Sequence, residues 1–337
     1  MTESEIALFL SFYQDSYPER DGTVSRFQSE LRNPLLEAGS ARGILAFEDG
    51  RIVGQLLIRP SEFISPDLKG RCYVGYDLFV HKEYRERGVG GLLVLDAVRR
   101  FAPYFTVGVS EMTRKMLLTL DMQVVGALDK YVWLRKSITT AVSIARGLTG
   151  KGAAGWHKRA YPELLTTLCG EFKLNLAPEL AASERPVSSN APLEFLRTVE
   201  FIRWRIMEHA NSYALYTSSD ERSVFFAVRI CAWRGLRLVS VVDYRYPLGE
   251  SRYLEAIIAC SKQLSDYLAT DGVITMSSHC EIDDTLRRCA FRKVGKPTMF
   301  MIPEQCVSDP NRIEARSAVL ATMADGDTDL LFKAVCS

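Results

Sequence analysis

The chain has 337 residues, enough for about two ordinary domains. Its 42 basic and 41 acidic residues give a formal net charge of +1, whereas proteins that bind nucleic acid electrostatically carry a strong basic excess. Hydrophobic residues make up 47% of the chain, and no uninterrupted apolar run approaches the roughly 20 residues of a membrane helix. We therefore expect neither nucleic acid nor a membrane as a partner.

The cysteines and histidines do not form a recognisable metal-binding pattern. Eight cysteines are scattered without a Cys-x-x-Cys pair, and His279-Cys280 is the only close pairing with one of the four histidines. Zinc sites need tighter spacings, so we expect no metal. Scattered thiols are typical of a reducing compartment, and no basic segment precedes the first apolar stretch as in a signal peptide. Both features predict a cytoplasmic protein.

Hydrophobic periodicity predicts alternating helices and strands in the first half. Apolar residues recur at helical spacing over residues 4–14, and a second helix is expected over 24–31. Asp49-Gly50 lies between apolar runs at 43–47 and 52–59, which indicates a hairpin. Further along, we expect a strand at 72–80, a helix at 92–101, a strand at 104–109, a helix at 111–120 and one or two strands over 123–134.

The composition changes after Arg135. Residues 137–192 combine glycines with small, basic and proline-containing stretches, so we expect a connector with some helix. This places a first domain at 1–136 and a second at 193–337. The second half repeats the first in pattern, with strands at 238–244 and 272–276 and helices at 253–268 and 283–289. Such self-similarity suggests two related domains.

The turn after Val80 carries the clearest chemical signal. An apolar strand stops there, and Gly88, Gly90 and Gly91 precede a helix. Glycines at a strand-to-helix turn let backbone amides approach an anion, and the helix start adds the positive end of its dipole. The nucleotide P-loop and the dinucleotide fingerprint are both absent. The segment predicts a diphosphate site, with a plain helix start as the alternative.

This segment resembles the acyl-CoA-binding motif of the GNAT N-acyltransferase superfamily, Arg/Gln-x-x-Gly-x-Gly/Ala. Arg85, Gly88 and Gly90 occupy its positions, and the looser resemblance spans residues 1–136. It implies an α/β (α+β) fold of two GNAT-like domains, each a mixed, mostly antiparallel sheet flanked by helices. It also implies acetyl-CoA as co-substrate. The residues assigned to coenzyme A are Phe79, Val80, Arg85, Glu86, Arg87, Gly88, Val89, Gly90, Gly91 and Ser110.

The catalytic groups are less clearly marked. Asp77, on the strand that ends at Val80, could bind a cationic amine or take its proton, or it could simply cap the backbone locally. Many relatives carry a tyrosine that protonates the leaving thiolate, but Leu117 stands at that position. Tyr84 is therefore the expected acid, with Tyr76 and Tyr104 as alternatives.

The second half lacks the glycine turn after Asp243, so we expect no coenzyme A there. Asp243, Trp204 and Arg205 are candidate contacts to the acceptor, because an aromatic ring beside arginine can grip a sugar or carboxylate. The alternatives are an amphipathic helix with Trp204 in the core and a degenerate domain that only completes the fold. A loose resemblance of this part to tandem-GNAT proteins of surface-polysaccharide pathways suggests an amino sugar.

These expectations combine into one function. The chain is expected to move an acetyl group from acetyl-CoA to a primary amine of a small molecule, an amino sugar among the candidates, by direct attack. A homodimer is compatible with this function. The alternative is an acyl-CoA-binding regulatory or scaffold protein without catalysis, which the absence of tyrosine at Leu117 favours.

Overall fold

The computed structural model describes residues 3–16, 23–36, 43–64, 69–109, 111–135, 159–167, 172–177, 193–209, 213–219, 221, 223–295, 298–303, 319–325 and 333–334. The chain folds as two compact units. Unit 1 consists of Met1–Gly126 with Thr298–Ala315, and unit 2 consists of Ala127–Pro297 with Arg316–Ser337.

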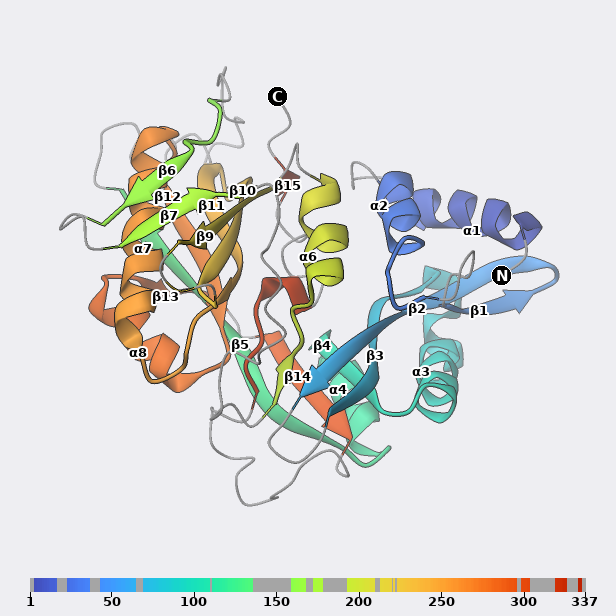
Figure 1. The fold of residues 1–337 in the computed structure, drawn as a ribbon. Coiled ribbons are helices and arrows are strands. Elements are labelled where there is room, and N and C mark those ends of the chain that lie inside the picture. Colours follow the sequence, from blue (N-terminus) through green and yellow to red (C-terminus); the bar gives the residue numbers. More distant parts are fainter. Residues whose placement is uncertain are drawn as a thin grey trace. The chain divides into compact units, whose positions relative to one another are not determined.

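Unit 1 contains a mixed sheet with the strand order β1-β2-β3-β4-β14 (Figure 1). The first three strands are antiparallel, β4 runs parallel to β3, and β14 is antiparallel to β4. Asp49 and Gly50 both adopt positive φ in the β1–β2 turn, which confirms the predicted hairpin. The strands are β1 (Gly43–Glu48), β2 (Arg51–Ile64), β3 (Lys69–Val80), β4 (Tyr104–Val109) and β14 (Thr298–Pro303).

Helices cover both faces of this sheet (Figure 1). Helices α1 (Glu3–Ser16) and α2 (Thr23–Glu30) bury Phe9, Tyr13 and Phe27 against one face. On the other face lie the 3-10 helix η1 (Lys82–Arg87), α3 (Val89–Arg100) and α4 (Glu111–Leu118). Strand β2 serves both cores, since Leu57 packs on the α1 side and Leu56 on the α3 side, as strand alternation requires.

Unit 2 contains a sheet with the order β5-β12-β11-β10-β9-β7-β6. Strands β10 and β11 are antiparallel, and β12 is parallel to β11 across a helix, which repeats the succession β2-β3-α3-β4. The strands are β5 (Met122–Leu134), β6 (Leu164–Thr166), β7 (Lys173–Leu176), β8 (Glu194–Phe195), β9 (Tyr213–Ser218), β10 (Phe225–Trp233), β11 (Leu236–Arg245), β12 (Gly272–Ser277), β13 (Arg292–Lys293) and β15 (Lys333–Ala334).

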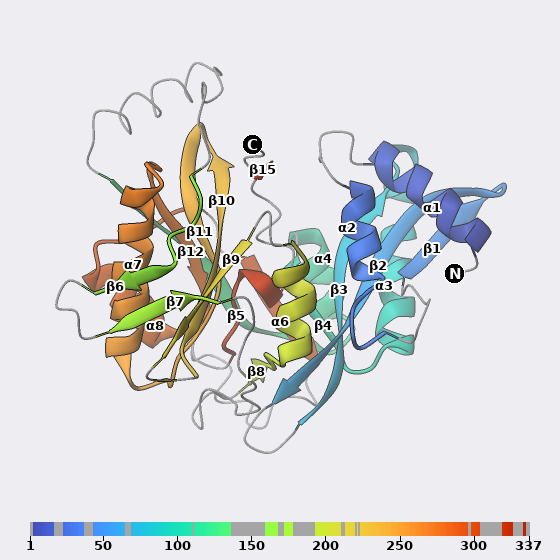
Figure 2. The same cartoon turned by 45° about the horizontal axis from the view of Figure 1, so that its top comes forward.

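In unit 2, helices α7 (Ser251–Tyr267) and α8 (Cys280–Arg288) lie on one side of the β9–β11 strands (Figure 2). Their apolar residues form the main core of the unit with the facing strand residues. The remaining helical segments are α6 (Val199–Arg205), η2 (Met207–His209) and η5 (Met323–Asp325).

The units do not follow the expected linear division of the chain. Unit 1 takes β14 from near the C-terminus, and β5 begins in unit 1 and continues into unit 2. The stretch interpreted as a connector contributes β6 and β7 to the sheet of unit 2. Composition could not show this, because strand pairing depends on partners far away in sequence.

None of the helices in the described ranges is long and apolar enough to cross a membrane. Within the same ranges, no group of three or more His, Cys, Asp or Glu side chains is arranged to hold a metal ion.

Candidate active site

Strand β3 contains a β-bulge at Asp77. In the β2–β3 ladder Leu57 pairs with Tyr76, whereas Gln55 pairs with Phe79, so two residues of β3 oppose one residue of β2. Asp77 adopts a φ of 48°, in the left-handed region that non-glycine residues seldom occupy. Bulges re-aim side chains and are frequent next to active sites.

The bulge turns Asp77 toward the layer of α1. Before it, Tyr76 packs in the α1 and α2 core, and after it Leu78 and Val80 pack in the α3 core. Regular alternation would place Asp77 on the α3 side with them. Its carboxylate instead accepts a hydrogen bond of 2.5 Å from the hydroxyl of Tyr13 on α1. The sequence pattern gave no sign of this contact.

Strands β3 and β4 pair over a short stretch only. The ladder joins Tyr73, Val74 and Gly75 of β3 to Tyr104, Phe105 and Thr106 of β4. On its other edge β4 pairs with β14, and β3 continues beside β2 as far as Val80. Within the residues that the structure describes, the bulged end of β3 therefore extends beyond its ladder with β4.

Glycine is required where the two strands meet. A Cβ at Gly75 would lie 1.9 Å from the hydroxyl oxygen of Tyr104. Burial raises the pKa of this hydroxyl, which lies in the core of the α3 side, so Tyr104 is poorly placed to exchange protons with a ligand.

The glycine turn follows directly at the end of β3. Gly88 ends η1 and caps α3 with a φ of 75°, a conformation that glycine adopts without strain. The first helical hydrogen bond runs from the amide of Leu92 to the carbonyl of Gly88, at 3.1 Å. The amides of residues 89–91 therefore precede the helical ladder, and the positive end of the α3 dipole lies at this turn.

Two arginines border the turn. The Nε of Arg85 donates to the carbonyl of Val80 at 3.0 Å, which fixes this side chain along the end of β3. Arg87 forms an exposed ion pair of 2.8 Å with Glu48 and lies over the ring of Tyr84. Glu86, between them, is exposed. The turn thus combines backbone amides with two guanidinium groups.

Tyr84 and Asp77 approach from different faces of the sheet. The Tyr84 ring packs against the α3 core, whereas Asp77 contacts Tyr13 on the α1 side. A hydrogen bond to Glu48 raises the pKa of Tyr84 above its ordinary value, so its hydroxyl keeps its proton. Leu117, where many relatives carry tyrosine, is buried in the α3 core. Ser110 lies outside the described residues.

Unit 2 has a bulge in the strand that corresponds to β3. Ala227 pairs with Asp243 but Val228 pairs with Val241, which leaves Val242 as an extra residue of β11. Because of this extra residue, Tyr244 lies in the same core as Val241, and Asp243 faces the opposite side of the sheet.

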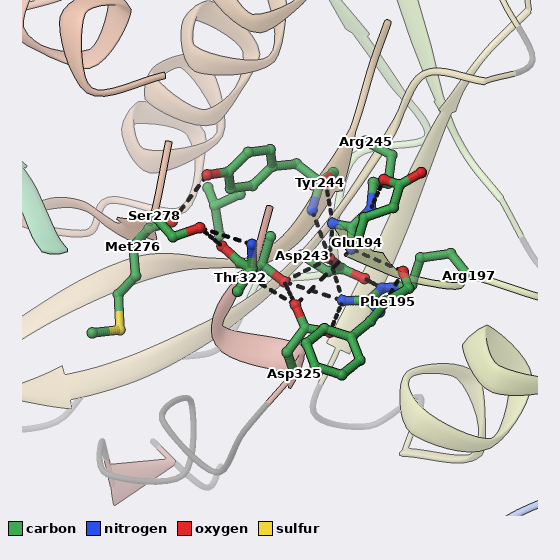
Figure 3. A network of polar contacts seen from close by, with 12 residues as sticks. Glu194, Phe195, Arg197, Asp243, Tyr244, Arg245, Met276, Ser278, Thr322 and Asp325 are labelled. Carbon is green, nitrogen blue, oxygen red and sulfur yellow. Dashed lines mark hydrogen bonds and ion pairs between the residues drawn. The ribbon is translucent and has the colours of Figure 1, made fainter. Parts of the chain in front are cut away.

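Asp243 lies at the centre of a buried ion-pair network (Figure 3). Its side chain is 0% exposed and accepts hydrogen bonds from Arg197 at 2.6 Å, Arg245 at 2.9 Å and Thr322 at 2.8 Å. Arg197 also binds Asp325 at 2.6 Å. Burial alone would raise the pKa of Asp243, but the charges of Arg197 and Arg245 outweigh it and hold this pKa below its ordinary value.

The turn that follows Asp243 already holds an anion. Gly249, with a φ of 90°, precedes α7 as Gly88 precedes α3. Its amide donates to both carboxylate oxygens of Glu281, at 3.1 Å each. A side chain of unit 2 therefore occupies the amide that would face a phosphate group.

The other candidate acceptor contacts lie in the interior of unit 2. Trp204 is 3% exposed and packs edge-on against Phe201, and Arg205 is buried with a contact of 3.4 Å to the hydroxyl of Tyr213. These positions favour the core-helix alternative for this segment. The closed network around Asp243 likewise favours a structural role for that residue.

The fold is shared with N-acyltransferases of known structure. N-myristoyltransferase of Saccharomyces cerevisiae with bound myristoyl-CoA superimposes with a TM-score of 0.56 at 12% identity, covering 89% of this chain and 80% of that enzyme. A putative acetyltransferase from Pyrococcus horikoshii gives 0.55 at 14% identity, with 95% and 91% covered. A probable N-acyltransferase from Enterococcus faecalis V583 gives 0.54 at 12% identity, with 90% and 72% covered.

Sequence comparison identifies the family. Residues 6–109 match the model of the Acetyltransferase (GNAT) family, and no curated protein matches the chain. Residues 6–109 therefore match a GNAT domain, as the glycine turn predicted. This match supports acyl transfer from acyl-CoA as the chemistry of the matched domain.

Proposed function

We propose that the chain transfers an acetyl group from acetyl-CoA to a primary amine of a small molecule by direct attack of the amine. The observation that carries this proposal is the arrangement in unit 1, where the glycine turn at the start of α3 directly follows a bulged strand that leaves its neighbour. A diphosphate and an extended chain need these two features side by side.

The amides at Gly88, Val89, Gly90 and Gly91 are proposed to hold the pyrophosphate of coenzyme A. A free helix start favours negative charge, and the exposed guanidinium groups of Arg85 and Arg87 add to this field. The backbone of Phe79 and Val80 would offer hydrogen bonds to the pantetheine arm, because this edge of β3 lies beyond its ladder with β4.

Asp77 is proposed to receive the acceptor amine. An amine is largely protonated at neutral pH and must lose a proton to attack a thioester. The Asp77 carboxylate is half-buried at the bulge, directly before the strand end that would carry the acyl group. Tyr84, with its retained proton, is the proposed acid for the leaving thiolate. An amino sugar remains the first acceptor to test, and Asp243, Trp204 and Arg205 are proposed as structural residues.

A non-catalytic acyl-CoA-binding protein is the second candidate. The burial of Leu117 in the core, at the position where many relatives carry their tyrosine, favours it. A thiol-release assay with a panel of primary amines separates the two. Release of coenzyme A that depends on an acceptor supports the enzyme, whereas binding without any such release supports the second candidate.

The coenzyme A site is tested by substitutions at Gly90. A Cβ there would meet only Val80, at an ordinary contact distance of 3.6 Å, so Gly90→Ala should fold and bind acetyl-CoA. Gly90→Glu places a carboxylate at the amides and should abolish binding. Calorimetry with both variants is the measurement, and parental affinity in folded Gly90→Glu would refute the site.

A further inference from the structure

We infer that Tyr13 is a positioning residue that holds the Asp77 carboxylate toward the acceptor amine. This inference rests on the proposed role of Asp77. It brings helix α1 into the active site, although the helical spacing of its apolar residues predicts only a core-facing helix.

The hydroxyl of Tyr13 is fixed by the packing of its ring. Tyr13 is 1% exposed, its ring stacks on Phe9 with centroids 5.3 Å apart, and it meets Phe27 edge-on at 6.4 Å. A ring held on two sides cannot swing away, so its hydroxyl remains at the Asp77 carboxylate at 2.5 Å.

The backbone of Asp77 is held from a second direction. Gln55 of β2, which is fully buried, donates its side-chain amide to the carbonyl of Asp77 at 3.3 Å. The left-handed backbone of Asp77 is an unfavourable conformation that persists only where its surroundings fix it. Tyr13 and Gln55 therefore orient the carboxylate and the peptide of the same residue.

A charged pair, Arg59 and Glu30, lies nearby in this layer. Arg59 of β2 binds Glu30 of α2 at 3.0 and 2.5 Å and lies over the ring of Tyr76. The hydroxyl of Tyr13 orients the Asp77 carboxylate. In contrast, two arginines enclose Asp243, so of the two bulge aspartates Asp77 is the more exposed one that an amine can approach.

The test is Tyr13→Phe, which keeps the ring and removes one hydroxyl. Turnover with a saturating amine should fall by about 10- to 100-fold, as for a lost hydrogen bond to a charged group, while the Kd for acetyl-CoA stays unchanged. Tyr246→Phe is the matched control, since it removes a buried hydroxyl in unit 2 and should keep parental turnover.

A double-mutant cycle distinguishes positioning from a general structural role. Adding Tyr13→Phe to Asp77→Asn should cost little more than Asp77→Asn alone, because the hydroxyl acts through that carboxylate. Fully additive losses, or parental turnover in Tyr13→Phe, overturn the inference and leave the proposed function in place. Parental turnover in Asp77→Asn overturns the inference together with the proposed role of Asp77. If Tyr13→Phe melts early, thiol release is measured below its melting temperature, where parental turnover still overturns the inference.

Discussion

Asp77 in unit 1 and Asp243 in unit 2 are two aspartates at corresponding β-bulges. The charges that surround them differ. Asp77 is half-buried and accepts a hydrogen bond from a neutral hydroxyl. Asp243 is fully buried and forms ion pairs with two guanidinium groups. The buried ion pairs of Asp243 bind that residue to its own unit, so that removing one partner would leave an uncompensated buried charge.

The first prediction at this scale concerns Asp77→Asn. Turnover should fall by about 10²–10⁴-fold, the usual loss when acid–base help is removed, while the affinity for acetyl-CoA stays unchanged. Without a base, turnover should depend more steeply on pH, because an amine with a pKa of about 8–10 then reacts only after losing its proton to solvent. Thiol release measured from pH 6 to pH 9 checks both points.

Asp121→Asn is the matched control for this experiment. Asp121 also adopts positive φ, at 55°, but it is exposed after α4 and forms no part of the proposed site. Asparagine tolerates the same backbone conformation, so this variant should behave as the parent. Equal turnover in Asp77→Asn and Asp121→Asn would exclude a catalytic role for Asp77.

The sequence pattern identified Asp77 as a candidate residue but did not identify Tyr13 as its hydrogen-bond partner. The acidic end of an apolar strand marked Asp77 as a candidate, yet plain alternation would have turned it toward α3. The bulge that reverses this direction has no glycine or other local signal at Asp77. Tyr13 was placed correctly on a helix, but a contact 64 residues away leaves no trace in local periodicity.

At the scale of elements, the same succession of strand, turn and helix occurs in both units, but different groups lie beside the glycine of the turn. Gly88 opens α3 with exposed arginines beside it, whereas the amide of Gly249 before α7 is bound by Glu281. The glycine spacing Arg85-x-x-Gly88-x-Gly90 predicts a diphosphate site in the first copy. The carboxylate at the second turn comes from α8, so sequence alone could not assign it.

This difference predicts one coenzyme A per chain. Calorimetric titration with acetyl-CoA should give a stoichiometry near one, and Gly90→Glu should bring it to zero because unit 2 offers no replacement site. Residual acetyl-CoA binding by Gly90→Glu, or a parental stoichiometry near two, would contradict this prediction. Either result would show that a phosphate group can displace Glu281 from the amide of Gly249.

At the scale of the whole molecule, buried charges and strand pairing between distant segments stabilise each unit internally. The Arg197, Asp243 and Asp325 network joins segments of unit 2 that are up to 128 residues apart (Figure 3). Breaking one partner of such a pair leaves an uncompensated buried charge. Sequence analysis singled out Asp243 alone, because charge pairs between distant segments have no periodic signature.

Removing the Arg197 side chain should therefore destabilise unit 2. Arg197→Met is expected to lower the free energy of unfolding by about 3–5 kcal/mol, whereas Arg252→Met, which breaks the exposed pair with Glu250, should cost about 1 kcal/mol or less. Urea denaturation of both variants is the measurement. Equal, small effects would show that the network contributes no net stability.

The same network predicts how stability depends on pH. The pKa of Asp243 is held below its ordinary value in the fold, so its contribution is fully present above the unfolded pKa of about 3.9. That contribution is lost as pH falls through the lower pKa of the folded state. Parent protein should therefore lose stability in acid more steeply than Asp243→Asn, which urea midpoints at pH 3 and pH 6 would reveal.

Strand β14 has a consequence for how the protein is made. Residues 298–303 pair with β4 in the sheet of unit 1, although the first segment of that unit ends at Gly126. During synthesis, the edge of β4 waits for about 170 further residues to leave the ribosome, which at roughly 5–20 residues per second means many seconds. An unpaired strand edge invites association with other chains. The late arrival of β14 therefore leaves the edge of β4 exposed to such association during synthesis.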